Sequence, residues 1–430
     1  MARQGIRKFN DQLLKFFNIF RTKAVIGRIL FTLLIIAVFE LGVYLPLPGI
    51  NGGKMGHLAS NMFFQQMNLA SGGALNNFGL FALGTGPYVN ASIITQLLVV
   101  LVPKYEQFSK GGQWGQQKLA QRTRIFTLFF GVAEAIAMLT VFKQWSAFNI
   151  LTNVTTVDKC LIIVIITFTS VLVSYLGELI NDRGIGNGIS IMITAGIMVD
   201  FIPKAYEIVY TNFAPAFLTK KFNWTAFDNA LITLAVCVTV ILLTIWATLT
   251  EKRLPLQSAQ LKTQTEAHYL PVKLMAGSMI PVIFASSIFG AFGVTGQLLH
   301  IKWMQLNYNT DWRAMAIYAV MILIFAMFYN VTQLNPEQIQ DGFEKSSTYI
   351  IGVPVTKTAD YLTSTILRIS LIGAPVLAII VMTPIVIGKA WPAWNAQISG
   401  TDLLIIVAVI TEFATEISGL TGKYHYKHLL

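Results

Sequence analysis

Apolar residues along the chain gather in long runs that are separated by short polar segments. A membrane-spanning helix needs about 20 mainly apolar residues to cross a hydrocarbon core of roughly 30 Å. Ten such runs lie near 24–45, 80–102, 124–142, 157–177, 188–209, 228–249, 272–293, 313–332, 368–387 and 402–420. The pattern therefore predicts an all-α polytopic membrane protein with ten transmembrane helices.

Composition supports the same fold class. Hydrophobic residues make up 54% of the 430 positions and charged residues only 12%, with a mean hydropathy of +0.62. This balance lies far outside that of a soluble globular domain.

The distribution of basic residues predicts how the chain is oriented. The termini and the even-numbered loops hold 22 of the 31 Lys and Arg residues, and cytoplasmic loops carry the excess of such residues. Both termini are therefore expected on the cytoplasmic side of the membrane. Contact with anionic lipids and this bias explain the net charge of +11, so no specific nucleic-acid sequence is expected as a partner.

The ten predicted spans divide into two sets of five. We expect a cytoplasmic amphipathic segment at 1–23, a first half at 24–209, an outer-side hinge at 210–227, a second half at 228–420 and a cytoplasmic tail at 421–430. An odd number of spans in each half gives the halves opposite topology, as in an inverted repeat. The longest polar connections, 250–271 and 332–368, are too short to form a separate domain.

Motifs of enzymatic chemistry are absent from the sequence. There is no GxxxxGK[ST] loop, no HExxH and no Cys/His spacing suited to zinc, so we expect no catalytic residue, cofactor or metal. The GIGNG stretch at 184–188 is interpreted as a turn. Cys160 and Cys237 are expected to be small buried hydrophobes within spans.

Acidic residues inside the predicted spans are compatible with a secondary transporter. A charge at the centre of a bilayer helix costs about 3 kcal/mol. The candidates are Glu40, Glu134, Asp200, Glu412 and Glu416. Only Glu134 and Glu412 lie deep, and a secondary transporter with five-plus-five inverted repeats would use them as a proton or ion relay. The other interpretation is that these acids lie near span ends or face a hydrated interior, which we favour.

Three extended motifs carry a resemblance to a known family. The runs SGGALNNFGLFALGTGPYVNASIITQLL, LGELINDRGIGNGISIMITAGI and IPVIFASSI resemble the second, fifth and seventh spans of SecY protein-translocation channels. PLPGI, NPEQ and GTDLLIIVAVITEF extend the resemblance over nearly the whole chain. It implies a clamshell of two halves around a central pore that conducts unfolded secretory polypeptides, with a lateral gate between spans two and three and spans seven and eight.

The resemblance also implies a ring of side chains that seals the pore. Matched motif by motif, the ring consists of Thr85, Val89, Ile189, Ile193, Ile283 and Ile410. An apolar constriction dewets when it is empty and still yields around a passing chain. Thr85 departs from the isoleucine expected there. An almost wholly aliphatic ring favours the protein-conducting channel over the secondary transporter, because a transporter should place convergent polar groups at the midplane.

Two further elements follow from the resemblance. A re-entrant plug half-helix is expected at 61–75, including Asn61, Met62, Phe63, Phe64, Met67, Leu69, Ser71, Gly72 and Gly73. The lateral gate is expected to include Pro87, Asn90, Ser92, Gln96, Ser286 and Ser287. Irregular backbone at membrane depth is tolerated only inside protein or a water-filled cavity, and a plug inside a funnel meets that condition.

Partners follow from the resemblance as well. It implies a SecA-type motor ATPase docking at Lys252, Arg253, Lys345 and Lys357, small SecE-like and SecG-like subunits, signal peptides and a ribosome. Val353 occupies the position where many members of the family carry an arginine, in a GIRPG-like turn. This departure leaves two alternatives open, a housekeeping channel and an accessory SecY dedicated to serine-rich glycoprotein adhesins in a Gram-positive bacterium.

Overall fold

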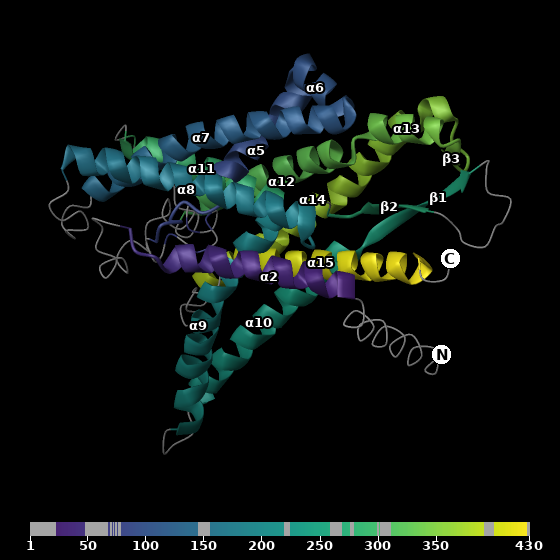
Figure 1. Ribbon diagram of the computed structural model, residues 1–430. Helices are drawn as coiled ribbons and strands as arrows, with labels where there is room; N and C mark the ends of the chain where they lie inside the picture. Colours follow the sequence, from purple (N-terminus) through teal and green to yellow (C-terminus); the bar gives the residue numbers. More distant parts are fainter. Residues whose placement is uncertain are drawn as a thin grey trace. The chain divides into compact units, whose positions relative to one another are not determined.

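The structure is a computed structural model of the chain, drawn in Figure 1. It describes residues 23–47, 68, 71, 73, 75, 79–144, 155–218, 224–258, 269–275, 279–298, 301, 311–390 and 400–427. The predicted N-terminal amphipathic segment lies outside the described residues.

Long helices follow the apolar runs, so the prediction of a mainly helical chain is confirmed. They are α2 (Lys23–Tyr44), α5 (Gly86–Leu101), α7 (Gly112–Gln144), α8 (Thr156–Arg183), α9 (Gly188–Leu218), α10 (Trp224–Leu249), α11 (Ile280–Leu298), α12 (Trp312–Leu334), α14 (Thr358–Ala390) and α15 (Gly400–Lys427). Within the described residues, six helices are long and apolar enough to cross a membrane. A seventh is added if α5 and α6 (Pro103–Lys110), which meet at a bend of 101°, form one span. The count of ten spans stays a prediction.

Several helices extend beyond the predicted apolar runs. α7 begins at Gly112 rather than near 124, and α14 begins at Thr358 rather than near 368. α9 continues to Leu218, into the segment expected to be an outer hinge. Backbone hydrogen bonds do not require apolar side chains, so a helix continues outside the hydrocarbon region wherever its residues favour it.

A small sheet corrects the prediction of an all-α chain. It consists of β1 (Glu251–Ser258), β2 (Tyr269–Lys273) and β3 (Thr348–Ile350) in the order β2-β1-β3. Both pairings are antiparallel, with Lys252 opposite Val272 and Leu256 opposite Ile350. The strands come from the two long polar connections, which the sequence analysis treated as loops.

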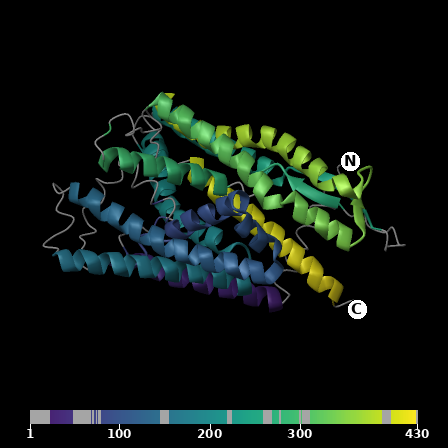
Figure 2. The same ribbon diagram turned by 90° about the horizontal axis from the view of Figure 1, so that it is seen from above.

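One hydrophobic cluster joins this sheet to the neighbouring helices. Its buried members are Leu254, Val272, Ile350, Leu362 and Ile366. The sheet thus packs on α14, and residues of α12 and α13 (Pro336–Lys345) complete the cluster. α12 and α14 lie side by side along much of their length, as Figure 2 shows. The short 3-10 helix η4 (Val355–Lys357) leads from the sheet into α14.

The chain divides into two compact units. Unit 1 comprises Met1–Val89, Arg124–Asp200 and Val409–Leu430, and unit 2 comprises Asn90–Thr123 and Phe201–Ala408. α5, α7, α9 and α15 therefore each contribute residues to both units. The division into two five-span halves stays a prediction.

Candidate functional site

A glycine-rich turn precedes α5 in unit 1 and lies directly against α2. Leu80 N donates to Leu45 O at 2.7 Å, and Pro46 forms a β-bridge with Gly79. A Cβ atom on Gly79 would lie 1.8 Å from the carbonyl oxygen of Val43. Glycine is therefore required here for the close approach of two backbones.

The described part of the predicted plug is buried against this turn. Ser71 is 1% exposed; its Oγ donates to Asn68 O at 3.0 Å and accepts from Leu75 N at 3.3 Å. Gly73 has a φ of +82°, and a Cβ atom there would lie 2.9 Å from Oδ2 of Asp200. The other named plug residues, Asn61, Met62, Phe63, Phe64, Met67, Leu69 and Gly72, lie outside the described residues.

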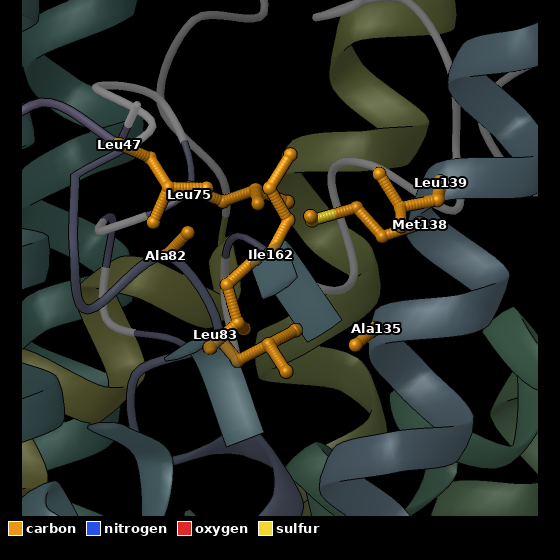
Figure 3. Packing of buried hydrophobic residues seen from close by; sticks show 9 residues of the cluster. Leu47, Leu75, Ala82, Leu83, Ala135, Met138, Leu139 and Ile162 are labelled. Atoms are coloured by element: carbon orange, nitrogen blue, oxygen red, sulfur yellow. The ribbon is translucent and has the colours of Figure 1, made fainter. Parts of the chain in front are cut away.

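Leu75 seats this segment in the core of unit 1. It is fully buried in a cluster with Leu47, Ala82 and Leu83 on the neighbouring connections. Figure 3 shows these side chains gathered near Ile162 of α8, with Ala135, Met138 and Leu139 supplied by α7. Apolar packing of Leu75 and the hydrogen bonds of Ser71 both hold the described part of this segment.

Thr85 directly precedes α5 (Gly86–Leu101). It is fully buried, and its carbonyl oxygen accepts from Val89 N at 3.0 Å as the first turn of the helix forms. Threonine is favoured over isoleucine at the residue before a helix, because its hydroxyl can accept from the free N–H groups of the first turn. Pro87 follows within that turn, where a missing N–H costs little.

The remaining ring positions differ in exposure. Ile189 and Ile193 lie four residues apart on α9 and so share one helix face, and Ile193 is fully buried. Ile283 near the start of α11 in unit 2 is 1% exposed. Ile410 on α15 is 51% exposed, unlike the other five positions. The assignment of these six residues to one ring stays a prediction.

The predicted lateral-gate residues lie on α5 and α11. Pro87 and Ser286 are buried, whereas Asn90, Ser92, Gln96 and Ser287 are half-buried. Ser286 Oγ donates to Ile283 O at 2.8 Å within its own helix. Among the described residues, Oε1 of Gln96 is buried without a hydrogen-bond partner.

Charged groups in unit 1 include an ion pair that the sequence analysis missed. Arg124 of α7 donates from Nε to Oε1 of Glu178 of α8 at 3.2 Å, and Nη2 contacts Oε2 in a fork-to-fork arrangement. The two residues lie 54 positions apart, and no motif in the sequence pairs them. Both oxygens of Glu40 are buried without a hydrogen-bond partner among the described residues.

Cysteine exposure differs from expectation, and the described residues hold no metal site. Cys160 is exposed and Cys237 is half-buried, and both are free thiols. The prediction that Cys160 is buried is wrong, because it points away from the packed face of α8. No group of three His, Cys, Asp or Glu in the described ranges could hold a metal ion.

The predicted motor-docking residues lie on the sheet and on the elements beside it. Lys252 and Arg253 belong to β1, Lys345 ends α13 and Lys357 ends η4. Arg253 Nε lies 2.8 Å from Oε1 of Glu251, and its guanidinium lies 4.7 Å from the ring centroid of Tyr269 on β2. All four side chains are exposed.

Val353 does not lie on this exposed basic surface. Its side chain is half-buried against the cluster beneath the sheet, and its N–H donates to Ile350 O at 3.1 Å. The preceding Gly352 has a φ of +85° and completes a tight turn. Val353 therefore acts as a packing residue.

Comparison with known proteins places the chain in a family. The SecY family profile matches residues 79–414. The protein translocase subunit SecY of Lactococcus lactis subsp. cremoris is 34% identical over 425 residues, which are 95% of this chain and 95% of that protein.

Two solved structures share the fold. One, described as a protein-conducting channel, aligns with a TM-score of 0.61 at 17% identity, over 91% of this chain and 92% of that chain. The other is a SecY protein whose plug domain is described as stabilising the closed translocation channel and maintaining a membrane seal. It aligns with a TM-score of 0.59 at 16% identity over the same shares. With the profile match and the identity across 95% of its length, the chain belongs to the SecY family of protein translocase subunits.

Proposed function

We propose that this chain forms the pore of a Sec translocase and conducts unfolded secretory polypeptides across the plasma membrane. The observation that carries the proposal is the family match over residues 79–414, which spans every ring and gate position named above. The seal would consist of Thr85, Val89, Ile189, Ile193, Ile283 and Ile410. Five of these are β-branched aliphatic residues, whose bulk excludes water but yields to a passing chain.

The plug would close the pore from the outer side. In support, Ser71 and Leu75 are buried and Gly73 fits tightly against Asp200, so the described residues of the segment are packed within unit 1. Translocation would displace it. Signal and membrane segments would leave through the lateral gate formed by α5 and α7 on one side and α11 and α12 on the other.

The energy source would lie outside the chain. The sequence contains no nucleotide-binding motif, so we propose no enzymatic activity of its own and a SecA-type motor on the sheet that carries Lys252 and Arg253. SecE-like and SecG-like subunits would brace the helices, and a ribosome would be a further partner. Both termini would lie in the cytoplasm.

The type of channel and the transporter alternative are the finer parts of this proposal. Val353 packs beneath the sheet, which favours a motor contact different from one made by an arginine. The accessory channel for serine-rich glycoprotein adhesins is the narrower form of this proposal, and the housekeeping channel is its alternative. The secondary-transporter alternative, with Glu134 and Glu412 as a relay, has no comparable support.

Reconstitution tests the proposal. Vesicles that contain the full chain and its small subunits should take up an unfolded secretory polypeptide when a motor and ATP are supplied. Uptake of a small solute under an ion gradient, without any polypeptide uptake, would contradict it. Co-purification of the motor from its source membrane would identify which ATPase docks.

A further inference from the structure

Two short helices from distant parts of the sequence meet in unit 2. Lys110, the last residue of α6, places its Nζ 2.7 Å from Oε2 of Glu337 on α13 and 2.8 Å from Oε1 of Glu106 on its own helix. Gln338 Nε2 donates to both the carbonyl oxygen and the Oγ of Ser109, each at 3.0 Å. Glu337 and Gln338 belong to the NPEQ motif, to which the proposed function assigns no role.

α13 is fixed firmly to α12 and α14. Asn335, with a φ of +32°, is the single residue between α12 and α13, and its Oδ1 accepts from Gln338 N at 3.4 Å. Ala359 N of α14 donates to Oε1 of Gln340 at 2.9 Å. Ile339 and Phe343 pack against the cluster beneath the sheet. α13 therefore moves with α12.

α6 is held much more weakly. No residue of α6 is buried, and Val102 alone separates it from α5. Gly111 alone separates it from α7, and Phe108 packs edge-on against Trp114 of α7. α6 therefore moves with the ends of α5 and α7. The polar contacts to α13 tie those ends to α12.

The chemistry of the contact makes it both specific and breakable. The side chains of Lys110 and Glu337 are 42% and 62% exposed, and exposed ion pairs are worth little individually and are screened by salt. Hydrogen bonds from Lys110 to Glu106 and Glu337 raise the pKa of its ammonium, so it stays charged at neutral pH. Without that charge, two carboxylates would face each other.

We propose that the contact between α6 and α13 is a latch that holds the lateral gate shut at its cytoplasmic end. The inference rests on the proposed function, because that function places α5 and α7 on one side of the gate and α12 on the other. Opening the gate separates these helices and breaks the bonds of Lys110 and Gln338. Glu337 and Gln338 of the NPEQ motif thereby supply the α13 side of the latch.

A distance measurement tests the latch without any transport. Spin labels at Gln107→Cys and Gly342→Cys, in a chain with both native cysteines replaced by alanine, report the separation of α6 and α13 in lipid nanodiscs. Both label positions are exposed, and a Cβ atom on Gly342 meets nothing within 4 Å. Lys110→Glu should raise the separated population about fivefold, the scale of a broken exposed ion pair.

Charge-matched variants show whether a change in distance comes from the contact itself or from the altered charge. Lys104→Glu on α6 and Asp341→Lys on α13 change the same charges outside the contact and should leave the distances unchanged. The double variant Lys110→Glu with Glu337→Lys should restore the short distance. Distances that are unchanged in Lys110→Glu, or shifted equally by Lys104→Glu, would overturn the latch.

A transport assay then links the latch to the gate. In reconstituted vesicles with the motor, Lys110→Glu and Gln338→Leu should raise uptake of a substrate with a defective signal sequence several-fold. Uptake of the intact substrate should change little. If wild-type vesicles take up no polypeptide, the proposed function fails, whereas the distance measurement still decides the latch.

Discussion

A Cβ atom built on Gly84 would lie 2.3 Å from the carbonyl oxygen of Ser71, so the turn before α5 and the predicted plug touch backbone to backbone. Gly84 also has a φ of +49°, a conformation that costs other residues about 1–2 kcal/mol. The plug segment and the start of the gate helix therefore form one packed unit that only glycine permits at this position.

Gly84→Ala is expected to unseat the plug. The methyl group must push Ser71 away, and the strained backbone adds about 1–2 kcal/mol to the cost. We expect a raised ion conductance of the idle channel in planar bilayers and a lower melting temperature. Gly27→Ala in α2 is the control, because nothing lies within 4 Å of a Cβ atom there. Equal conductance in both variants would contradict the packing argument.

Ile283→Asn is expected to hydrate the predicted seal. The side chain is 1% exposed, and burial of an amide without a partner costs about 1–3 kcal/mol. Idle ion leak and passage of substrates with defective signal sequences should both rise, whereas Ile283→Val should change neither. Ile410→Asn should cause leak with less loss of stability, because Ile410 is already 51% exposed. Unchanged leak in both Asn variants would remove these residues from the ring.

Arg253→Ala is expected to weaken motor docking several-fold while leaving the fold intact. Its guanidinium is exposed, paired with Glu251 and stacked over Tyr269, so it is held in place for an acidic or carbonyl-bearing partner. The affinity of the motor ATPase for vesicles provides the measurement. Arg253→Lys keeps the charge and loses the planar stacking, so its motor affinity should lie between those of the wild type and Arg253→Ala. A motor affinity that is unchanged in Arg253→Ala would place the docking surface elsewhere.

Val353→Arg tests the distinction between accessory and general channels. The longer side chain should leave the cluster beneath the sheet and extend its guanidinium to the surface near β3. If the native valine excludes the general motor, the variant should bind that motor more tightly than the wild type does. Val353→Leu, which keeps the apolar packing, is the control. Tighter binding by both variants would show that the charge is not the cause.

The sequence predicted the elements that depend on apolar length and missed those that depend on local geometry. A helix follows each apolar run, because a helix satisfies its backbone polar groups within its own segment. The first residues of two runs differ, since 80–85 form turns and 272–273 belong to β2. The sheet was missed, although Leu254 and Leu256 occupy alternate positions on β1, and Leu270 and Val272 do so on β2. Such alternation over a few residues, interrupted by Pro255 and Pro271, is too short to outweigh a loop interpretation.

The candidate site likewise contains residues that the sequence predicted and contacts that it did not. Thr85 departs from the otherwise aliphatic ring, and only the structure shows that it directly precedes α5, a position where a threonine hydroxyl can accept from the N–H groups of the first turn. The close fit of Gly73 on Asp200 and the bonds between Lys110 and Glu337 join residues more than 100 positions apart. No periodicity in the sequence encodes such contacts.

The central claim is that a polypeptide passes through this chain, and photo-crosslinking from the proposed ring tests it most directly. A crosslinking amino acid would be placed at Ile193 or Ile283. Phe168 of α8, which is 66% exposed, is the control position. A translocating substrate would be arrested midway by a folded domain at its end. We predict that the arrested polypeptide crosslinks at Ile193 and Ile283 and not at Phe168. Arrested substrate that crosslinks at neither ring position, although vesicles have protected part of it from protease, would contradict the account.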